Sequence, residues 1–501
     1  MKLNLKRVLA IVLALAMCLS LAACGGNGGS EGSKGTEGTK ETEAKPGEIT
    51  NIVMWLPIMF DTPDPQSIED EVNKYSEERY GIHYDLEFVP LGDYTQKRNM
   101  ALTGDELDVF WGGGYSMIKN GQLYDITDLY EPYKAQLENE EHSEFLPRFQ
   151  ANNYFNGRLY TINYLVDRNH HLSFNMDQEV ADKYGIQNMQ EISLAELEEL
   201  FPKMHEDFPD RDVIGPTGTT YILGNMFWTW DPVQDAIGVL PNKGQDDELV
   251  LESIFDNEDY INFVTKCEEW YNKGYINPDI LSNTNQWAVL LTNHQICGCF
   301  DTFGVNNVAG SIRTRVKEVG NWCQSLGGGG YSINANSKHP EKAFEALMLC
   351  YTDKDIATVI NSGVEGKNYT KNADGTISYP GGSAATSGYG GPTLYWALPG
   401  SETANLPLDI NGPTYFKDLN DFCLAATMSK GYGFIFDPTP VMDEWTACTN
   451  VLNKYYYAMA SGAVPVKETL ETARAEMKAA GEDKVIAEKQ KQLDEWLKNK
   501  K

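Results

Sequence analysis

The spacing of apolar residues after position 48 predicts alternating strands and helices. Residues 52–56 form an apolar run that predicts a buried strand, and residues 64–81 have the 3.6-residue spacing and the terminal glycine of a helix. Residues 82–89 alternate apolar and polar positions, which predicts a second strand. A helix over 93–104 and a strand that ends at Trp111 follow. This β-α-β-α-β order predicts a largely parallel sheet with helices on its faces.

The rest of the chain continues the α/β pattern and ends in helices. Ser193 and Glu196 have the spacing of a capping box, which predicts a helix after Ser193. Residues 295–301 predict a buried strand, and the sequence beyond about residue 440 predicts helices. Apolar spacing predicts four buried helical faces, made by Phe263, Cys267 and Trp270, by Phe344, Leu347 and Tyr351, by Val466, Leu470, Ala473 and Met477, and by Ile486, Leu493 and Leu497.

The N-terminal residues indicate export. Lys2, Lys6 and Arg7 precede the apolar segment 8–23, as in a secretory signal peptide. The segment is somewhat short for a membrane-spanning helix, which needs about 20 residues. The sequence Leu-Ala-Ala-Cys that ends at Cys24 resembles the lipobox of bacterial lipoproteins. The resemblance implies cleavage before Cys24 and a diacylglyceryl (palmitate-type) thioether on its sulfur, and the alternative is an ordinary signal peptide with an incidental cysteine.

A flexible tether is predicted after the signal peptide of residues 1–23. Residues 24–48 contain the cysteine followed by Gly, Ser, Thr, Glu and Lys, with no large apolar residue. Such a segment cannot bury enough surface to offset its chain entropy. The folded body begins near Ile49, and acyl chains can hold a soluble body on a membrane because each buried methylene contributes about 0.8 kcal/mol. The expected location is therefore the extracellular face of the cell membrane.

The net charge argues against nucleic acid as a partner. The full chain has a formal net charge of −31, and removal of the three basic residues of the signal peptide leaves −34. A body this acidic repels nucleic acid and anionic surfaces. We therefore expect a neutral or cationic ligand.

The cysteines do not indicate a disulfide framework or a metal site. Seven remain beyond the signal peptide and Cys24, an odd number with wide spacing. Cys297 and Cys299 lack CxxC spacing and a nearby pair of histidines, so packing is favoured over a zinc site. The sequence thus indicates no metal and no other cofactor.

Four segments, taken in order, resemble a known family. They are 80–111, 274–279, 363–370 and the C-terminal region 441–499. Together with the lipobox and tether, they are similar to extracellular solute-binding protein family 1, the sugar-binding lipoproteins of Gram-positive ABC importers. The similarity is to a subgroup linked to polysaccharide uptake, and it covers essentially the whole mature chain.

The resemblance implies an α/β clamp of two lobes, each a mostly parallel sheet flanked by helices, with a helical C-terminal region. The chain would cross between lobes near 163–167, 325–329 and 349–355. Lobe 1 would contain 49–165 plus 327–352, and lobe 2 would contain 166–326 plus 353–501, with the C-terminal helices from about 440. The implied function is that a monomer captures a sugar or oligosaccharide in the cleft and delivers it to the permease subunits of an ABC transporter. A peptide or other solute is the alternative ligand.

A sugar site requires two kinds of side chain. Its C–H faces stack on aromatic rings, and its hydroxyls need paired donors and acceptors because a buried unpaired polar group costs roughly a few kcal/mol. Such side chains are expected at the carboxyl ends of parallel strands. The candidate ligand-binding residues are Trp55, Trp111, Asp167, Trp228, Trp230, Asp301, Glu365, Tyr369 and Trp396.

Several of these candidates have alternatives. Trp111 ends a strand that resembles one with a stacking tryptophan in maltodextrin-binding proteins, and core packing is its alternative. Trp228 and Trp230 resemble an aromatic stretch of the same proteins, and one of the two is expected to stack. Asp301 follows a strand where those proteins have a tryptophan, so a hydroxyl acceptor, an N-cap and a salt bridge remain open. Asp167 lies at the first predicted crossing.

The glycines after Trp111 raise the alternative of a phosphate loop. No GxGxxG or Gly-Lys-Ser/Thr sequence accompanies Gly112 to Gly114, and the chain is acidic. Because glycine lacks a Cβ, the three residues are predicted to give room for a sharp turn and a closely approaching ligand. Glu365 and Tyr369 likewise lie in a glycine-flanked loop, and Trp396 lies in LYWALPG.

A surface glycoside hydrolase or lyase is the remaining alternative. Glycosidases need two carboxylates at a set separation, one with a raised pKa, and the 72 acidic residues leave room for such a pair. No HExxH or P-loop motif is present. The sequence therefore favours a binding protein over an enzyme.

Overall fold

The computed structural model describes residues 49–163, 173–188, 190–215, 229–282, 295–300, 311–325, 329–391, 397–401 and 404–500. The predicted signal peptide, Cys24 and the tether lie outside these residues, as do Asp167, Trp228, Asp301 and Trp396. Within these ranges, no helix has both the length and the apolar character needed to cross a membrane.

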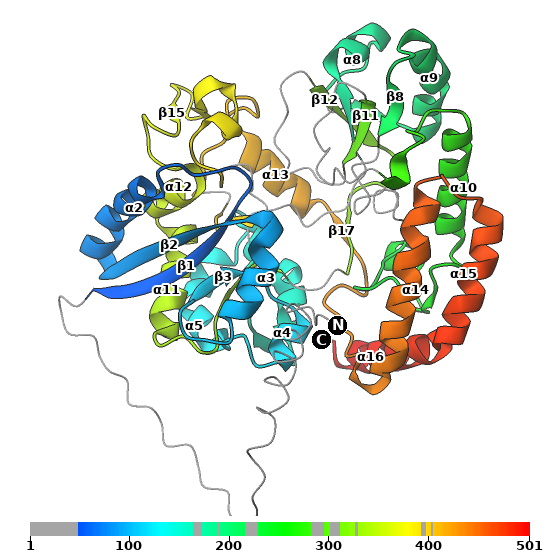
Figure 1. The fold of residues 1–501 in the computed structure, drawn as a ribbon. Coiled ribbons are helices and arrows are strands. Elements are labelled where there is room, and N and C mark those ends of the chain that lie inside the picture. Colours follow the sequence, from blue (N-terminus) through cyan, green and yellow to red (C-terminus); the bar gives the residue numbers. More distant parts are fainter. Residues whose placement is uncertain are drawn as a thin grey trace, which may run out of the picture. The chain divides into compact units, whose positions relative to one another are not determined.

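The N-terminal segments fold as the sequence predicts. Strands β1 (Thr50–Ile58), β2 (Ile82–Pro90) and β3 (Val109–Trp111) are parallel, and helices α2 (Pro65–Tyr80) and α3 (Leu91–Ala101) lie between them in the chain (Figure 1). The sheet order is β14-β3-β1-β2, and β14 (Tyr331–Ile333) is antiparallel to β3. The β-α-β-α-β prediction is confirmed.

The two faces of this sheet bury different side chains. Met54 and Leu56 of β1 pack with α2, α11 (Pro340–Thr352) and α12 (Lys354–Ser362), and we call this cluster the first core. Trp55 points to the opposite face, where it packs with Phe110 of β3 and Leu107. Because successive side chains of a strand alternate, one strand supplies both clusters.

The first core includes later residues than the predicted lobe 1. Ile356 and Ile360 of α12 pack in it, and so does Leu398, whereas the sequence predicts that lobe 2 begins at residue 353. The junction of α11 and α12 is held on α2, because Asp353 accepts a hydrogen bond of 2.7 Å from the Tyr80 hydroxyl. The chain therefore does not leave the first core at the crossing predicted near 349–355.

The second sheet is mixed. Its order is β7-β12-β6-β11-β8, with strands β6 (Ser173–Asp177), β7 (Gln190–Ile192), β8 (Asp212–Gly215), β11 (Gln295–Phe300) and β12 (Ser311–Val316). Strand β6 is antiparallel to β11 and β12, whereas β8 and β7 are parallel to these neighbours. In each sheet the antiparallel strand is the one by which the chain enters from the other sheet, β6 here and β14 in the first.

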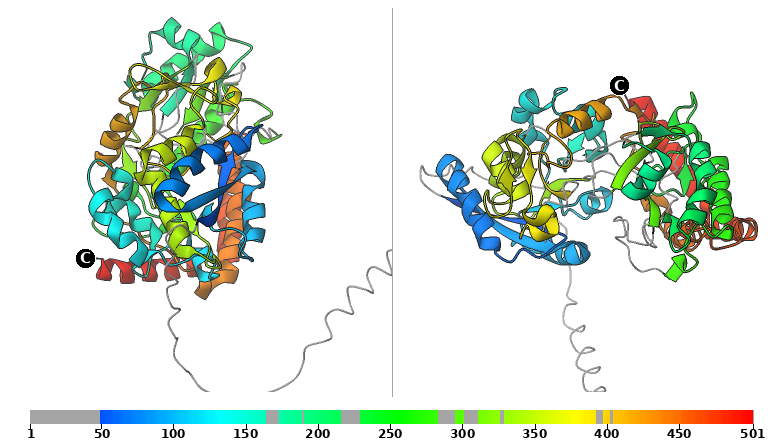
Figure 2. Two further views of the ribbon diagram at one scale, coloured as in Figure 1. Left: turned by 90° about the vertical axis from the view of Figure 1, so that its left-hand side faces the viewer. Right: turned by 90° about the horizontal axis from the view of Figure 1, so that it is seen from above.

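Several helices share a core with the second sheet, and three of them carry apolar faces predicted from the sequence. The helices of this core are α8 (Gln178–Tyr184), α9 (Leu194–Asp207), α10 (Glu258–Asn272), α14 (Met442–Ala460), α15 (Val466–Ala480) and α16 (Glu482–Asn499), the last three coloured orange to red in Figures 1 and 2. The capping box of α9 is present. All four predicted residues of α15 are buried. Together with the second sheet these helices form a second core.

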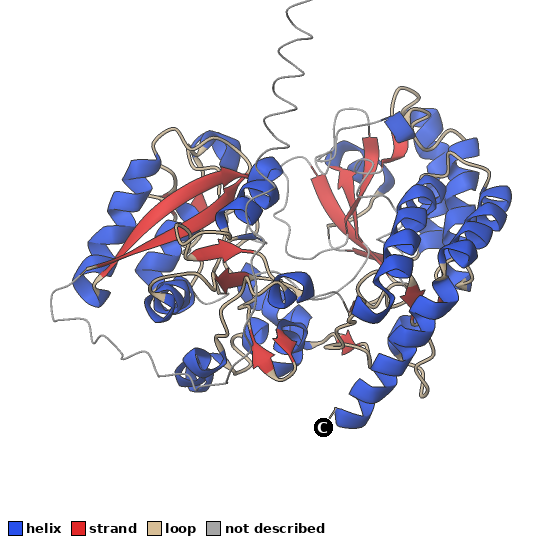
Figure 3. Ribbon diagram, turned by 60° about the horizontal axis from the view of Figure 1, so that its bottom comes forward, coloured by secondary structure: helices blue, strands red, loops and turns tan. Residues whose placement is uncertain are grey.

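The remaining elements are short and are shown by type in Figure 3. Four helices are about one turn long: α4 (Tyr115–Lys119), α5 (Thr127–Tyr130), α6 (Lys134–Leu137) and α7 (Pro147–Gln150). Helix α13 (Tyr415–Leu424) is longer. The short strands are β4 (Tyr154–Phe155), β5 (Arg158–Leu159), β9 (Gly238–Val239), β10 (Glu252–Ser253), β13 (Trp322–Cys323), β15 (Thr370–Lys371), β16 (Ile377–Ser378) and β17 (Thr427–Met428).

Six cysteines of the described residues are buried, four of them in these two cores. Cys297 is buried in β11, which confirms the predicted buried strand, and the thiols of Cys267, Cys323, Cys350, Cys423 and Cys448 are buried too. Burial raises the pKa of Cys297 to about 12, because the thiolate would lose its hydration.

Helix α16 buries a lysine on its predicted apolar face. Leu493 is buried as expected, but the same face buries Lys489 completely. The ammonium of Lys489 lies 2.7 Å from Oδ1 of Asp235 and donates to the Gly238 carbonyl at 3.0 Å. The indole of Trp445 donates to the other oxygen of Asp235 at 2.9 Å. This buried ion pair joins α14 and α16 to the 231–240 loop.

Removal of this ammonium is expected to destabilise the protein. Lys489→Met leaves a mostly buried carboxylate without its cation and should lower the free energy of unfolding by about 3 kcal/mol, measured by urea denaturation. Lys491→Met is the matched control, since Lys491 is exposed and pairs with Glu488 one turn before it. Its effect should stay within about 0.5 kcal/mol. Equal effects of the two substitutions would contradict a structural role for the buried pair.

Candidate functional site

The carboxyl ends of the parallel strands of the first sheet meet at one edge. Ile58 at the end of β1 is aligned with Pro90 at the end of β2, and Trp55 is aligned with Phe110 just before Trp111. In open α/β sheets, ligands bind outside this edge. We therefore take it as the candidate site.

Tyr94 of α3 fixes the two tryptophans at this edge. Its buried hydroxyl donates to the carbonyl of Trp55 at 3.1 Å and accepts from the backbone N–H of Trp111 at 2.9 Å. Its ring meets both indoles edge-on, with centroids 6.5 Å and 5.6 Å away. Burial raises the pKa of Tyr94 well above its ordinary value, so the hydroxyl stays protonated and can donate.

The glycines after Trp111 make room for protein groups. Gly112 has φ +141°, and a Cβ there would lie 2.2 Å from Nη1 of Arg98. That nitrogen donates to the carbonyl of Trp111 at 3.1 Å, and burial lowers the pKa of the Arg98 guanidinium. A Cβ on Gly113 would lie 2.5 Å from the Thr161 hydroxyl. The predicted sharp turn is thus present, and Arg98 and Thr161 take up the room.

A cavity of about 590 Å³ opens beside this edge, and we call it the edge cavity. Ile58, Leu86, Glu87, Phe88 and Pro90 line it from the strands, and Asp61, Thr62, Pro63 and Pro65 line it from the segment between β1 and α2. Its volume falls in the range of about 300–1,000 Å³ typical of small-ligand sites. An aromatic ring, a hydroxyl and two carboxylates here match the chemistry that a sugar requires.

The segment before residue 392 holds one side of the edge cavity in place. Gly390 accepts a hydrogen bond of 3.0 Å from the Met59 backbone N–H and donates one of 3.1 Å to the Thr62 hydroxyl. A Cβ on Gly390 would lie 1.6 Å from the Phe60 carbonyl oxygen, so only glycine fits. The ring of Tyr389 meets Phe88 edge-on at 5.6 Å.

The predicted loop 363–370 lies at the start of α2, next to the lining of the edge cavity. Lys367 pairs with Asp64 and contacts the Ser67 hydroxyl at 2.6 Å, and the pairing lowers the pKa of Asp64. Glu365 is exposed and forms an ion pair of 3.1 Å with Lys371. Tyr369 is only 3% exposed in a small cluster of its own, and burial raises its pKa to about 12. Of the two predicted residues, Glu365 is therefore the accessible one.

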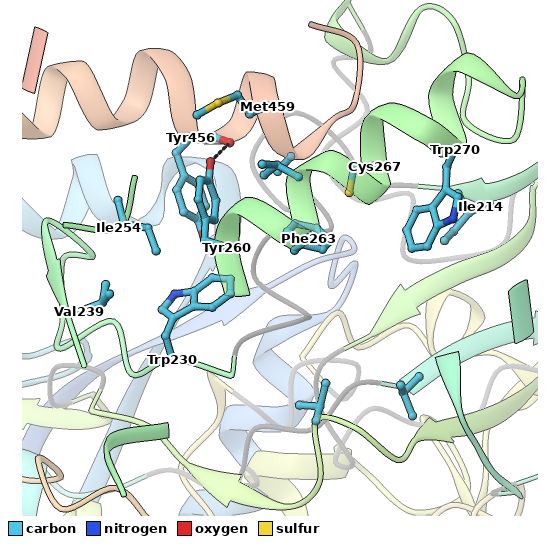
Figure 4. Packing of buried hydrophobic residues seen from close by; sticks show 14 of the residues in the cluster. Ile214, Trp230, Val239, Ile254, Tyr260, Phe263, Cys267, Trp270, Tyr456 and Met459 are labelled. Carbon is cyan, nitrogen blue, oxygen red and sulfur yellow. Dashed lines mark hydrogen bonds between the residues drawn. The ribbon is translucent and has the colours of Figure 1, made fainter. Parts of the chain in front are cut away.

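Of the predicted tryptophans, Trp55 and Trp111 lie at the candidate edge and are partly buried. Trp230 instead is fully buried in the second core, edge-on to Tyr260 at 5.8 Å, and Tyr260 stacks on Tyr456 (Figure 4). Trp230 thus fills core, and its predicted partner Trp228 lies outside the described residues. A sugar contact by Trp55 or Trp111 stays a prediction.

Sequence reasoning did not select Asp61, Glu87 and Phe88. All three follow or end a predicted strand, so the rule that ligands gather at carboxyl strand ends could have found them. Tyr94 had no comparable signal, because its role depends on the spacing between α3 and the sheet.

Two α/β cores, each with a sheet that the chain leaves and re-enters, define the fold of the two-lobe solute-binding proteins. The fold is similar to that of the N-glycan transport solute binding protein NgtS of Streptococcus pneumoniae, with a TM-score of 0.74, 21% identity and coverage of 90% of this chain and 100% of that chain. Its complex with Man5GlcNAc gives a TM-score of 0.69 at 21% identity, over 90% of this chain and 99% of that chain. An HMO-binding, ABC-transporter-associated solute binding protein of Bifidobacterium longum infantis gives a TM-score of 0.59 at 12% identity, over 91% of this chain and 100% of that chain.

Sequence comparison gives the same class of relative. The chain is 24% identical over 450 residues to a carbohydrate ABC transporter substrate-binding protein of Streptococcus pneumoniae serotype 4, which covers 86% of this chain and 87% of that protein. Residues 430–498 match the family model of a domain of unknown function, DUF3502, and this range covers α14, α15 and all but the last residue of α16.

Proposed function

We propose that this protein captures a sugar or oligosaccharide between its two lobes and delivers it to the permease of an ABC importer. The edge cavity is the main observation that supports the proposal. It is lined by Phe88, Asp61 and Glu87 at the carboxyl edge of a parallel sheet, so that an aromatic ring and two carboxylates lie together there. The similar fold of glycan-binding proteins supports it. We include Trp55 and Trp111 among the residues that stack on the ligand.

The remaining parts of the proposal follow from the N-terminal sequence. A diacylglyceryl group on Cys24 would hold the protein on the extracellular face of the membrane, and the tether would give the body freedom to reach the permease. We propose a monomer that binds its ligand without chemical change. Asp167, Trp228, Asp301, Glu365, Tyr369 and Trp396 stay proposed ligand contacts.

Ligand binding is tested by a thermal-shift screen of the purified protein. The first probes are Man1GlcNAc and Man5GlcNAc, since NgtS has been solved in complex with both. A glycan that binds only the folded state raises the melting temperature by mass action. A shift with peptides and none with any glycan would contradict the sugar assignment, and new reducing ends after incubation would contradict binding without catalysis.

Loss of the Trp111 ring is expected to weaken binding. If the ring stacks on the sugar, Trp111→Ala should reduce the free energy of binding by roughly 1–3 kcal/mol, measured by calorimetry with the best glycan of the screen. Trp496→Ala in α16 is the control, because that indole is also partly buried but packs against the second core. Lower stability with unchanged affinity would assign Trp111 to the core.

The carboxylates of the edge cavity are expected to discriminate against acidic glycans. A mannose 6-phosphate derivative of Man5GlcNAc should bind about tenfold more weakly than the neutral glycan at low salt, because like charges repel. The difference should shrink at 1 M salt, where the Debye length is about 3 Å.

The same discrimination should depend on two residues. Asp61→Asn combined with Glu87→Gln should reduce the difference between the two glycans. Asp128→Asn combined with Glu131→Gln, two exposed carboxylates of the α5 region, should leave it unchanged. An equal response of both double variants would mean that the net charge of the whole chain, and not the edge cavity, sets the selectivity.

A further inference from the structure

A second, smaller cavity lies at the carboxyl end of the parallel pair β7 and β12 in the second sheet. Its volume is about 120 Å³, and we call it the β12 cavity. Arg315, Lys317, Asn321, Glu191 and Phe422 contribute its functional groups. Arg315 and Glu191 are aligned neighbours on the two strands, so their side chains leave the same face of the sheet.

Two polar atoms at the β12 cavity lack partners among the residues that the structure describes. Nε of Arg315 is buried, and no acceptor for it exists among the described residues. Oδ1 of Asn321 is likewise buried with no donor in the described part of the chain, although Nδ2 of the same amide donates to the Phe422 carbonyl at 2.8 Å. A buried donor or acceptor left unpaired costs about 1–3 kcal/mol. A ligand that pairs both atoms would remove this cost.

The ring and the charges narrow the chemistry of that ligand. The guanidinium of Arg315 lies 5.6 Å from the centroid of Phe422, the aromatic surface of the cavity. Lys317 is engaged with Glu196 at 3.5 Å. Arg315 offers a donor, whereas Asn321 and Glu191 offer acceptors. A simple anion would satisfy the arginine but be repelled by Glu191, whereas a hydroxyl both accepts and donates.

We propose that the β12 cavity binds one hydroxyl-rich unit, a single sugar residue, separately from the edge cavity. The unit accepts a hydrogen bond from Nε of Arg315, donates to Oδ1 of Asn321 and lies beside Phe422. The volume of the β12 cavity lies below the range of about 300–1,000 Å³ for drug-sized ligands. The cavity therefore fits one sugar residue and not an oligosaccharide. The proposal rests on the proposed function, and it adds a subsite on the second sheet with its own residues.

The test uses the full chain labelled with ¹⁵N-arginine. The Nε–H resonance of Arg315 is identified by its absence from Arg315→Lys, and it should move when Man5GlcNAc or methyl α-mannoside is added. Arg315→Lys should weaken binding of Man5GlcNAc about tenfold, because lysine lacks the directed Nε donor. The melting temperature should not change, since this Nε has no acceptor among the described residues.

Arg148→Lys is the matched control. Arg148 also lies over a phenylalanine ring, at 4.7 Å from Phe149, but its guanidinium donates to the Leu424 carbonyl and does not line the β12 cavity. Its affinity for Man5GlcNAc should equal that of the unsubstituted protein. A lower melting temperature for Arg315→Lys with unchanged affinity would overturn the proposal in favour of a structural arginine.

Three other outcomes also decide the question. If Man5GlcNAc binds and Trp111→Ala weakens it while the Arg315 resonance stays still, the subsite is refuted and the proposed function stands. If sodium sulfate moves the resonance and neither sugar does, the cavity is an anion site and the proposal fails. If no glycan binds in any assay, it is the proposed function that fails.

Discussion

The hydroxyl of Tyr94 is the contact on which the candidate edge depends. This hydroxyl donates a hydrogen bond to the carbonyl of Trp55 and accepts one from the N–H of Trp111, so it connects β1 and β3 to α3. Trp55 is the last residue of β1 that pairs with β3, and Trp111 follows the last residue of β3 that pairs with β1. Because a buried backbone group without a partner is costly, the position of α3 is coupled to the position of both indoles.

A second constraint is the absence of side chains at three positions around this edge. Arg98 occupies the space at Gly112, Thr161 that at Gly113, and the Phe60 carbonyl that at Gly390. Each contact brings together segments that are far apart in sequence or belong to different elements. Close packing of protein groups therefore shapes the edge. The glycine run after Trp111 makes room for this packing and is not needed to bind phosphate.

Local patterns predicted most of the elements but not their grouping. The faces of α11 and α15 and the capping box of α9 follow from spacing within one helix, and the structure confirms them. The sequence did not predict where the chain leaves the first core. The apolar face of α12 is visible in the sequence, but its spacing does not tell which of the two cores it packs in. Lys489 was missed for the same reason, since its partner Asp235 is far away in sequence.

The sequence predicted the location of the candidate site at the carboxyl ends of parallel strands, but only some of its residues. Trp55 and Trp111 were selected because strand ends are visible in the sequence, and they do lie at the carboxyl edge. Trp230 shows the limit of the argument, because an aromatic stretch has the same composition whether it faces a ligand or a core. The groups of the edge cavity come from two strands and a loop, so no single motif marks them.

The way the two cores are assembled has a consequence for the order of folding. The first core needs Ile52 and also Leu398, and the second needs Phe174 and also Leu493. A chain synthesised from its N-terminus can therefore complete the first core only after Leu398 and the second core only after Leu493. Such long-range contacts slow folding and leave apolar surface uncovered in the meantime. Helices α14 to α16, which lie almost entirely in the region matched to a domain of unknown function, supply Cys448, Met477 and Leu493 to the second core and are needed to complete it.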